Sequence, residues 1–180
     1  RHLPQRLHVL SGANYLLFER QPVASEEELI RRPEDDEVYL PIPGEVLVPG
    51  TVWEARAEVL PEMLTSRVAQ ALRQENWPEV WHLLEQPTPH AVYIDGASVG
   101  PQLLVRTRRP GDRIQPLGMA GEKKVQDIFV DKHIARDERA TTPLFFAETH
   151  CLWVAGACLD HRVRLTPNTQ RIVRLSIQPV

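Results

Sequence analysis

Residues 106–139 read RTRRPGDRIQPLGMAGEKKVQDIFVDKHIARDER and carry nine lysines and arginines. The run begins inside an alternating pattern over 102–108, which predicts a strand with Arg106 and Arg108 on one solvent-facing side. The tetrapeptide RPGD at 109–112 predicts a type II turn, because proline fixes φ at the first central position and glycine supplies the positive φ at the second. The stretch therefore predicts a strand and a tight turn that both carry positive charge.

The second half of this stretch has helical spacing. Val125, Ile128 and Phe129 lie at i, i+3 and i+4, which predicts an amphipathic helix over 123–132. The preceding GMAGEKK at 118–124 lacks the G-x-x-x-x-G-K-[ST] spacing of a nucleotide-binding loop. A glycine-bearing loop that opens a helix still presents backbone N–H groups and two lysines. This pattern favours contact with a backbone phosphate of a larger ligand.

The whole chain divides by pattern into a strand-rich start at 1–60, a helical elaboration at 61–90 and a basic core at 101–178, which contains the stretch above. Short apolar runs broken by proline and glycine characterise the start. Within the core, the segment at 151–160 predicts a buried hairpin that bends at its glycine. Strands, then helices, then strands predict an α+β fold, and we expect one module over 1–180.

The helical segment carries two tryptophans. Thr65 or Ser66 is predicted to cap its first piece, and Pro78 suits the first turn of its second piece. We expect Trp77 and Trp81 to pack the segment against a sheet. An aromatic binding platform is the alternative interpretation.

Charge is distributed unevenly along the 180 residues, whose net charge is −3. Residues 1–100 hold 8 Lys and Arg against 16 Asp and Glu, whereas residues 101–180 hold 13 against 8. Only the second part suits a polyanionic partner. A solvated surface with scattered charges is the alternative.

Several classes of protein find no support in the sequence. No run of apolar residues is long enough to span a membrane. The chain has no motif for hydrolytic catalysis, and we predict neither a catalytic residue nor a metal site. His150 and Cys151 are adjacent in a predicted strand and point to opposite faces, so they cannot easily share a metal.

Two cysteines are typical of a reducing compartment, so we expect a cytoplasmic protein.

A set of short elements gives the basic core a more specific resemblance. They are VRTRRPGDR (105–113), PLGMAGEKKVQDIFVDKHI (116–134), RDER (136–139), PL (143–144) and WVAG (153–156), followed by Asp160 and Arg162. In this order they resemble the C-terminal domain of the bacterial tRNA(Ile)-lysidine synthetase family. One departure is Ala135, where that family usually has proline.

The resemblance implies a β-sandwich-like core of unusual topology with flanking helices, also found in the β-subunit of phenylalanyl-tRNA synthetase. It implies a parent enzyme that uses ATP and Mg to attach lysine to the wobble cytidine of isoleucine tRNA. That chemistry belongs to an N-terminal domain with an S-G-G-x-D-S loop, which SGANY at 11–15 does not match. We therefore expect this chain to bind tRNA without catalysing a reaction or holding a cofactor.

Its expected partners are isoleucine tRNA and the protein's own N-terminal catalytic domain. We do not expect it to bind a membrane. The alternative is a structural module that packs on the catalytic domain or forms a homodimer. The residues that we predict to contact phosphate or ribose are Arg108, Arg109, Arg113, Lys123, Lys124, Lys132, Arg136, Arg139, Arg162 and Arg164. Surface salt bridges are the alternative for each, above all for Lys123, four residues before Asp127, and for Arg136.

Overall fold

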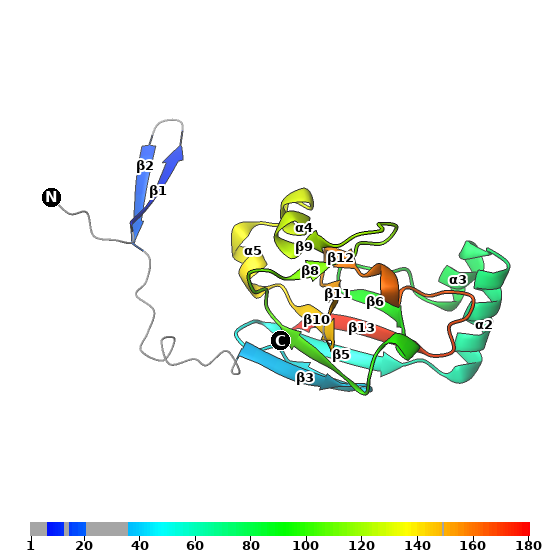
Figure 1. Ribbon diagram of the computed structural model, residues 1–180. Helices are drawn as coiled ribbons and strands as arrows, with labels where there is room; N and C mark the ends of the chain where they lie inside the picture. Colours follow the sequence, from blue (N-terminus) through cyan, green and yellow to red (C-terminus); the bar gives the residue numbers. More distant parts are fainter. Residues whose placement is uncertain (1–6, 13–14, 21–35, 149) are drawn as a thin grey trace. The chain divides into compact units, whose positions relative to one another are not determined.

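The computed structural model describes residues 7–12, 15–20, 36–148 and 150–180 (Figure 1). Contacts divide the chain into two compact units, 1–32 and 33–180. The first holds an antiparallel hairpin of β1 (Leu7–Gly12) and β2 (Tyr15–Arg20). Part of the predicted strand-rich start, at 21–35, lies outside the described residues. The expectation of one module over 1–180 stays a prediction.

The second unit contains two antiparallel sheets. The first sheet has the strand order β12-β11-β10-β7-β3. Its strands are β3 (Glu37–Pro41), β7 (Gln102–Arg106), β10 (Leu144–Ala147), β11 (His150–Val154) and β12 (Cys158–Leu159). β11 and β12 form the predicted hairpin, which turns at Gly156 with a φ of 75°. A positive φ suits glycine because it has no Cβ.

The second sheet has the order β4-β5-β13-β6. Its strands are β4 (Gly44–Leu47), β5 (Trp53–Val59), β6 (Ala91–Asp95) and β13 (Ile172–Pro179). β13, the last strand in the sequence, pairs with β5 on one side and with β6 on the other. The end of the chain therefore completes the interior of this sheet.

The two sheets share the main hydrophobic core. Val105 and Phe145 from the first sheet belong to one buried cluster with Ile94 and Leu175 from the second. Side chains alternate between the two faces of a strand, so the flanking residues of Phe145 face away from this cluster. The result is a sandwich of two sheets, and the predicted α+β class is confirmed.

Helices cover the sandwich at two ends (Figure 1). They are α2 (Glu62–Arg73), α3 (Trp77–Leu83), α4 (Val125–Asp131) and α5 (Arg136–Thr141), with 3-10 turns η2 (Gly96–Ser98) and η3 (His161–Val163). α2 and α3 share a buried cluster with Tyr93 and Ile172, whereas α4 shares one with Leu144 and Phe146. No helix within the described ranges is long and apolar enough to cross a membrane.

The predicted start of α2 is wrong. The helix begins at Glu62 after Pro61, and Thr65, predicted as a cap, is buried in its interior. Pro61 is itself the N-cap residue, with φ −55° and ψ 141°, and no side chain caps the helix. The prediction for Pro78 is confirmed, because it lies in the first turn of α3, where the Asn76 side chain accepts a hydrogen bond from the Glu79 N–H.

The predicted start of α4 is wrong by two residues. β9 (Lys123–Lys124) pairs with β8 (Arg113–Ile114) as a short antiparallel ladder, so the helix begins only at Val125. The glycine-bearing loop therefore opens a strand and not a helix. The apolar face is confirmed, since Val125, Ile128 and Phe129 are all buried.

Two adjacent residues of α4 test this packing. We expect Phe129→Ala to lower the free energy of unfolding by about 3–5 kcal/mol, because the fully buried ring leaves a cavity. Val130 on the exposed side is the matched control, and Val130→Ala should change the free energy of unfolding by no more than about 0.5 kcal/mol. Urea unfolding followed by circular dichroism measures both. Equal effects of the two substitutions would contradict the packing of α4.

Candidate nucleic-acid interface

A buried ion pair holds the turn after β7. Both terminal nitrogens of Arg106 donate to the carboxylate oxygens of Asp112 at 2.8 Å, and the guanidinium carbon lies 4.1 Å from the centre of the Phe146 ring. The backbone N–H of Arg109 donates to the same carboxylate at 2.6 Å. Gly111 has a φ of 94°, as the predicted type II turn requires. The turn is therefore anchored to the sheet.

The sequence predicts that Arg106 and Arg108 share a solvent-facing side of the strand. This prediction is wrong for Arg106, which is only 8% exposed. β7 ends at Arg106, and its side chain turns back onto Phe146 and Asp112. Burial alone raises the pKa of Asp112. The hydrogen bonds from Arg106 and from the Arg109 N–H outweigh burial, and they hold the pKa of this carboxyl below its ordinary value.

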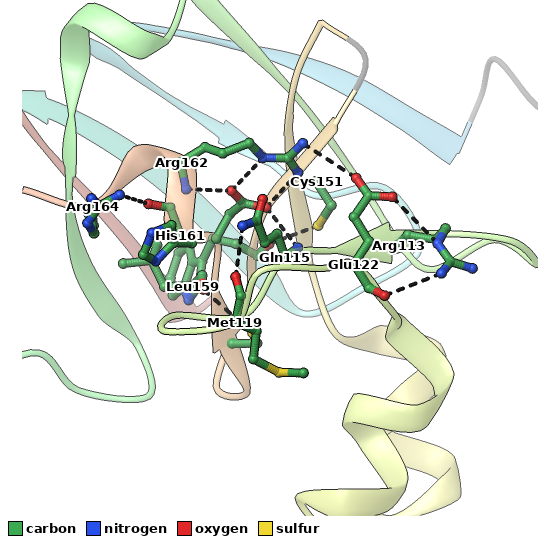
Figure 2. Close-up of polar contacts among 12 residues, drawn as sticks. Arg113, Gln115, Met119, Glu122, Cys151, Leu159, His161, Arg162 and Arg164 are labelled. Atoms are coloured by element: carbon green, nitrogen blue, oxygen red, sulfur yellow. Dashed lines mark hydrogen bonds and ion pairs between the residues drawn. The ribbon is translucent and has the colours of Figure 1, made fainter.

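Asp160 forms a second buried anchor, and Figure 2 labels its partners Gln115 and Arg162. Its carboxylate accepts hydrogen bonds from the Gln115 N–H at 3.0 Å and from the backbone and guanidinium of Arg162 at 2.8–2.9 Å. Burial raises the pKa of Asp160, but these donors outweigh it and the pKa lies below its ordinary value. Arg162 extends the network to Glu122 at 3.4 Å, and Glu122 lies 3.5 Å from Arg113.

These anchors give several of the predicted cations a structural partner. Arg162 and Arg113 belong to the network around Asp160 and Glu122, and Arg109 lies 2.9 Å from Glu37. Lys123 pairs with Asp131 and not with Asp127, because the two lysines lie in β9 and the helical spacing does not apply to them. The hydrogen bond that Lys123 donates to the Asp131 carboxylate raises the pKa of Lys123.

Three other predicted arginines gather around one hollow, here called the three-arginine hollow. It has a volume of about 520 Å³ and is lined by Arg108, Gln126, Arg136, Arg139 and Ala140. Arg108 comes from the turn after β7, Gln126 from α4 and the others from α5. No carboxylate of the described residues lines it. The hollow is thus a concentrated positive charge open to solvent.

The contacts inside this hollow leave donors available. Arg108 donates to the Gln126 side-chain oxygen at 3.1 Å, and the Nε of Arg139 donates to the Ile134 carbonyl at 2.8 Å. Across the described ranges the Arg136 side chain makes no ion pair or hydrogen bond, although salt bridges were the leading alternative for it. Gln126 was missed by the sequence analysis, although the helical period places it on the exposed face of α4.

The remaining candidates are dispersed. Lys124 and Lys132 are exposed, and their side chains have no ion-pair or hydrogen-bond partner among the residues that the structure describes. Arg164 donates to the His161 carbonyl at 2.8 Å and lines an apolar hollow beside α3. The fold therefore brings together three of the predicted residues and leaves these three separate.

The cysteines lack the properties of a nucleophile. Burial raises the pKa of the Cys151 thiol far above its ordinary range and raises that of Cys158 to about 11. Both thiols are therefore protonated at neutral pH. Within the described ranges, no three His, Cys, Asp or Glu side chains are grouped to hold a metal ion.

The basic core matches a known family. Residues 103–177 match the family model described as the TilS substrate C-terminal domain. These residues belong to the TilS C-terminal domain family. The resemblance stated from the sequence is thereby confirmed for these residues.

Two curated relatives carry the same domain. The tRNA(Ile)-lysidine synthase of Symbiobacterium thermophilum is 34% identical over 137 residues, which are 76% of this chain and 25% of that protein. The tRNA(Ile)-lysidine synthase of Geobacter sulfurreducens is 43% identical over 75 residues, which are 42% of this chain and 16% of that protein. The chain thus spans a quarter or less of the length of these relatives.

A solved structure of a TilS C-terminal domain shares this fold. A crystal structure of a TilS C-terminal domain aligns with a TM-score of 0.58 and 25% identity, over 80% of this chain and 98% of that chain. An N-terminal fragment of the phenylalanyl-tRNA synthetase β-subunit from Pyrococcus horikoshii reaches a TM-score of only 0.43 at 15% identity, too low to carry an argument.

The two depressed carboxyl pKa values predict acid sensitivity. Such a carboxylate stabilises the fold above its unfolded pKa, and this stability is lost as the pH falls below about 4. We expect Asp160→Asn to cost about 2–3 kcal/mol at pH 7, because Arg162 and the Gln115 N–H lose a charged acceptor. The variant should also lose less stability than the parent chain on acidification. Urea unfolding at pH 7 and pH 3 measures both effects.

Asp131→Asn is the matched control, because Asp131 is exposed and its removal breaks only the surface pair with Lys123. We expect a cost within about 1 kcal/mol and an unchanged acid sensitivity. An Asp160→Asn variant as acid-sensitive as the parent chain would contradict the anchoring role of Asp160.

Proposed function

We propose that this chain is the part of a tRNA(Ile)-lysidine synthase that holds isoleucine tRNA by its phosphate backbone. The three-arginine hollow carries the proposal, because it offers three guanidinium groups and no lining carboxylate within the described residues. Guanidinium groups bind phosphate through paired hydrogen bonds. Membership in the TilS C-terminal domain family and the names of the relatives support tRNA as the nucleic acid.

The distribution of charge supports recognition of an RNA duplex by shape. Side chains cannot read the deep major groove of A-form RNA, so proteins contact its phosphates and 2′-hydroxyls at several points. Arg108, Arg136 and Arg139 come from a turn and a helix, and Lys124 adds an exposed cation on β9. This arrangement suits a backbone that runs across several elements. It offers no single helix for reading base edges.

In this proposal the chain binds tRNA and the parent protein catalyses the reaction. The relatives' name implies attachment of lysine to isoleucine tRNA, and the family implies ATP and Mg in a separate N-terminal catalytic domain. In this proposal ATP and Mg are bound by that domain and not by this chain. A cytoplasmic location is part of the same proposal.

A structural module that packs on the catalytic domain, or forms a homodimer, is the competing function. The half-exposed Trp77 favours it, because an exposed tryptophan is often covered by a partner. The two functions differ in their dependence on salt. Phosphate contacts weaken steeply as salt rises, whereas an apolar interface does not.

We expect Arg136→Ala to weaken binding of isoleucine tRNA about tenfold, because each lost phosphate contact removes a charge-assisted hydrogen bond. It should also reduce the slope of log affinity against log salt by about one unit. Arg136 is the cleanest choice in the hollow because its side chain has no partner within the described ranges whose loss would disturb the fold. Fluorescence-anisotropy titration at several salt concentrations measures both quantities.

Arg67→Ala is the matched control, since Arg67 is also an exposed helical arginine but lies on α2, away from the hollow. We expect it to leave both affinity and salt slope unchanged. Binding that is absent, or that responds equally to Arg136→Ala and Arg67→Ala, would refute the role of the hollow. The competing structural function would then be favoured.

A further inference from the structure

A second hollow lies between α3 and the loop at 116–119. We call it the tryptophan groove, and it has a volume of about 360 Å³, near the low end of the range of about 300–1,000 Å³ for ligand pockets. Its walls include Trp77, Trp81, Tyr93, Leu117, Leu159 and Arg164. It shares no lining residue with the three-arginine hollow. The two are separate surfaces of the same unit.

The apolar walls of this groove are open to solvent. Trp77 and Leu117 are each 52% exposed, although water contact with such large apolar surfaces is unfavourable. The rings of Trp77 and Trp81 stack with their centres 6.2 Å apart at an angle of 26°. Stacking on Trp81 orients the Trp77 ring while half of its residue surface stays exposed. The groove therefore presents a pre-oriented aromatic surface.

Positive charge lies in the groove and beside it. Arg164 is the only charged side chain among the lining residues of the groove. Leu117 and Leu159 are shared with a neighbouring hollow that Lys123, Asp131 and Lys132 also line. The groove and its neighbour therefore combine apolar walls with cations.

The balance of charge in the neighbouring hollow is positive. Its one carboxylate, Asp131, pairs with Lys123, which leaves Lys132 with no partner among the described residues. Arg164, which lines the groove itself, is exposed, although one of its nitrogens donates to the His161 carbonyl. An occupant that extends from the groove into the neighbouring hollow therefore meets Arg164 and Lys132 and no unpaired carboxylate among the lining residues.

We propose that the tryptophan groove binds an unpaired nucleobase of an RNA strand, with the adjoining phosphates toward Arg164 and Lys132. A single strand of RNA places a flat apolar ring next to an anionic phosphate, which matches the aromatic wall and the two cations, Arg164 in the groove and Lys132 in the neighbouring hollow. Stacking on an aromatic side chain tolerates any base, because every base has a π-face. A polypeptide would need an apolar residue with acidic neighbours to match the same charges.

The choice of RNA as the occupant rests on the proposed tRNA-binding function. A tRNA held at the three-arginine hollow is presented to the rest of the domain at high effective concentration, so a weak second contact adds to affinity. Transfer RNA has an unpaired 3′ end beside its acceptor stem. The groove would thus recognise single-stranded RNA, whereas the hollow contacts duplex backbone.

Two RNA hairpins with the same stem test the groove, one blunt and one with a single-stranded 3′ extension. We expect the extension to tighten binding about 5- to 100-fold, the range typical of one stacked base. Trp77→Leu should abolish this gain, because leucine keeps the wall apolar but lacks a π-face, and Trp77→Phe should retain most of it. Anisotropy titration measures the affinities, and urea unfolding checks that each variant is folded.

Met63→Ala is the control, since Met63 is an exposed apolar residue on α2 that does not line the groove. It should leave the gain intact. A short single-stranded RNA, followed by quenching of tryptophan fluorescence, probes the groove without any duplex. If neither hairpin binds, the proposed function is refuted. Quenching by the short RNA in the parent chain, and no quenching in Trp77→Leu, would still support binding at the groove.

Three results would overturn the inference. The first is equal binding of the two hairpins together with no quenching by the short RNA, which would leave the duplex contact intact. The second is a gain from the extension that persists in Trp77→Leu. The third is self-association of the chain that Trp77→Leu removes, because a second polypeptide would then cover the groove.

Discussion

The buried ion pair between Arg106 and Asp112 sets the course of the chain on which the candidate interface depends. Two charges inside a protein are costly unless their geometry is good and their remaining donors and acceptors are used. Here both terminal nitrogens of Arg106 reach the carboxylate, the Phe146 ring lies beside the guanidinium, and the Arg109 N–H supplies a further donor, whereas the Arg106 Nε is buried with no hydrogen-bond partner among the described residues. This pair ends β7 and directs the following residues toward α4 and α5. Arg108 consequently reaches the three-arginine hollow.

Positive charge in the basic core therefore has two separate uses. Arg106 and Arg162 neutralise buried carboxylates, and their guanidinium groups belong to the architecture of the fold. Arg136 and Lys132 lie at the surface without such partners in the described part of the chain. An arginine that is already paired with a carboxylate must lose that contact before it binds phosphate, so the second kind is the better ligand for RNA.

The proposed RNA contacts differ in chemistry because their surfaces differ in composition. The three-arginine hollow has guanidinium groups and an amide, which suit the phosphates of a duplex. The tryptophan groove has aromatic and aliphatic walls with Arg164 among them and Lys132 in the neighbouring hollow, which suit an unstacked base and its phosphates. Together the two surfaces fit an RNA that passes from paired to unpaired structure.

The sequence by itself determined the α+β class, the hairpin that turns at Gly156 and the buried face of α4, because periodicity and turn chemistry are local properties. It also carried the family motifs in their order. Only the tertiary structure decided which cations remain for a ligand. Arg162 meets Glu122 across 40 residues, and Arg109 meets Glu37 on another strand. No local pattern encodes such pairs, because folding alone brings these side chains within reach of each other.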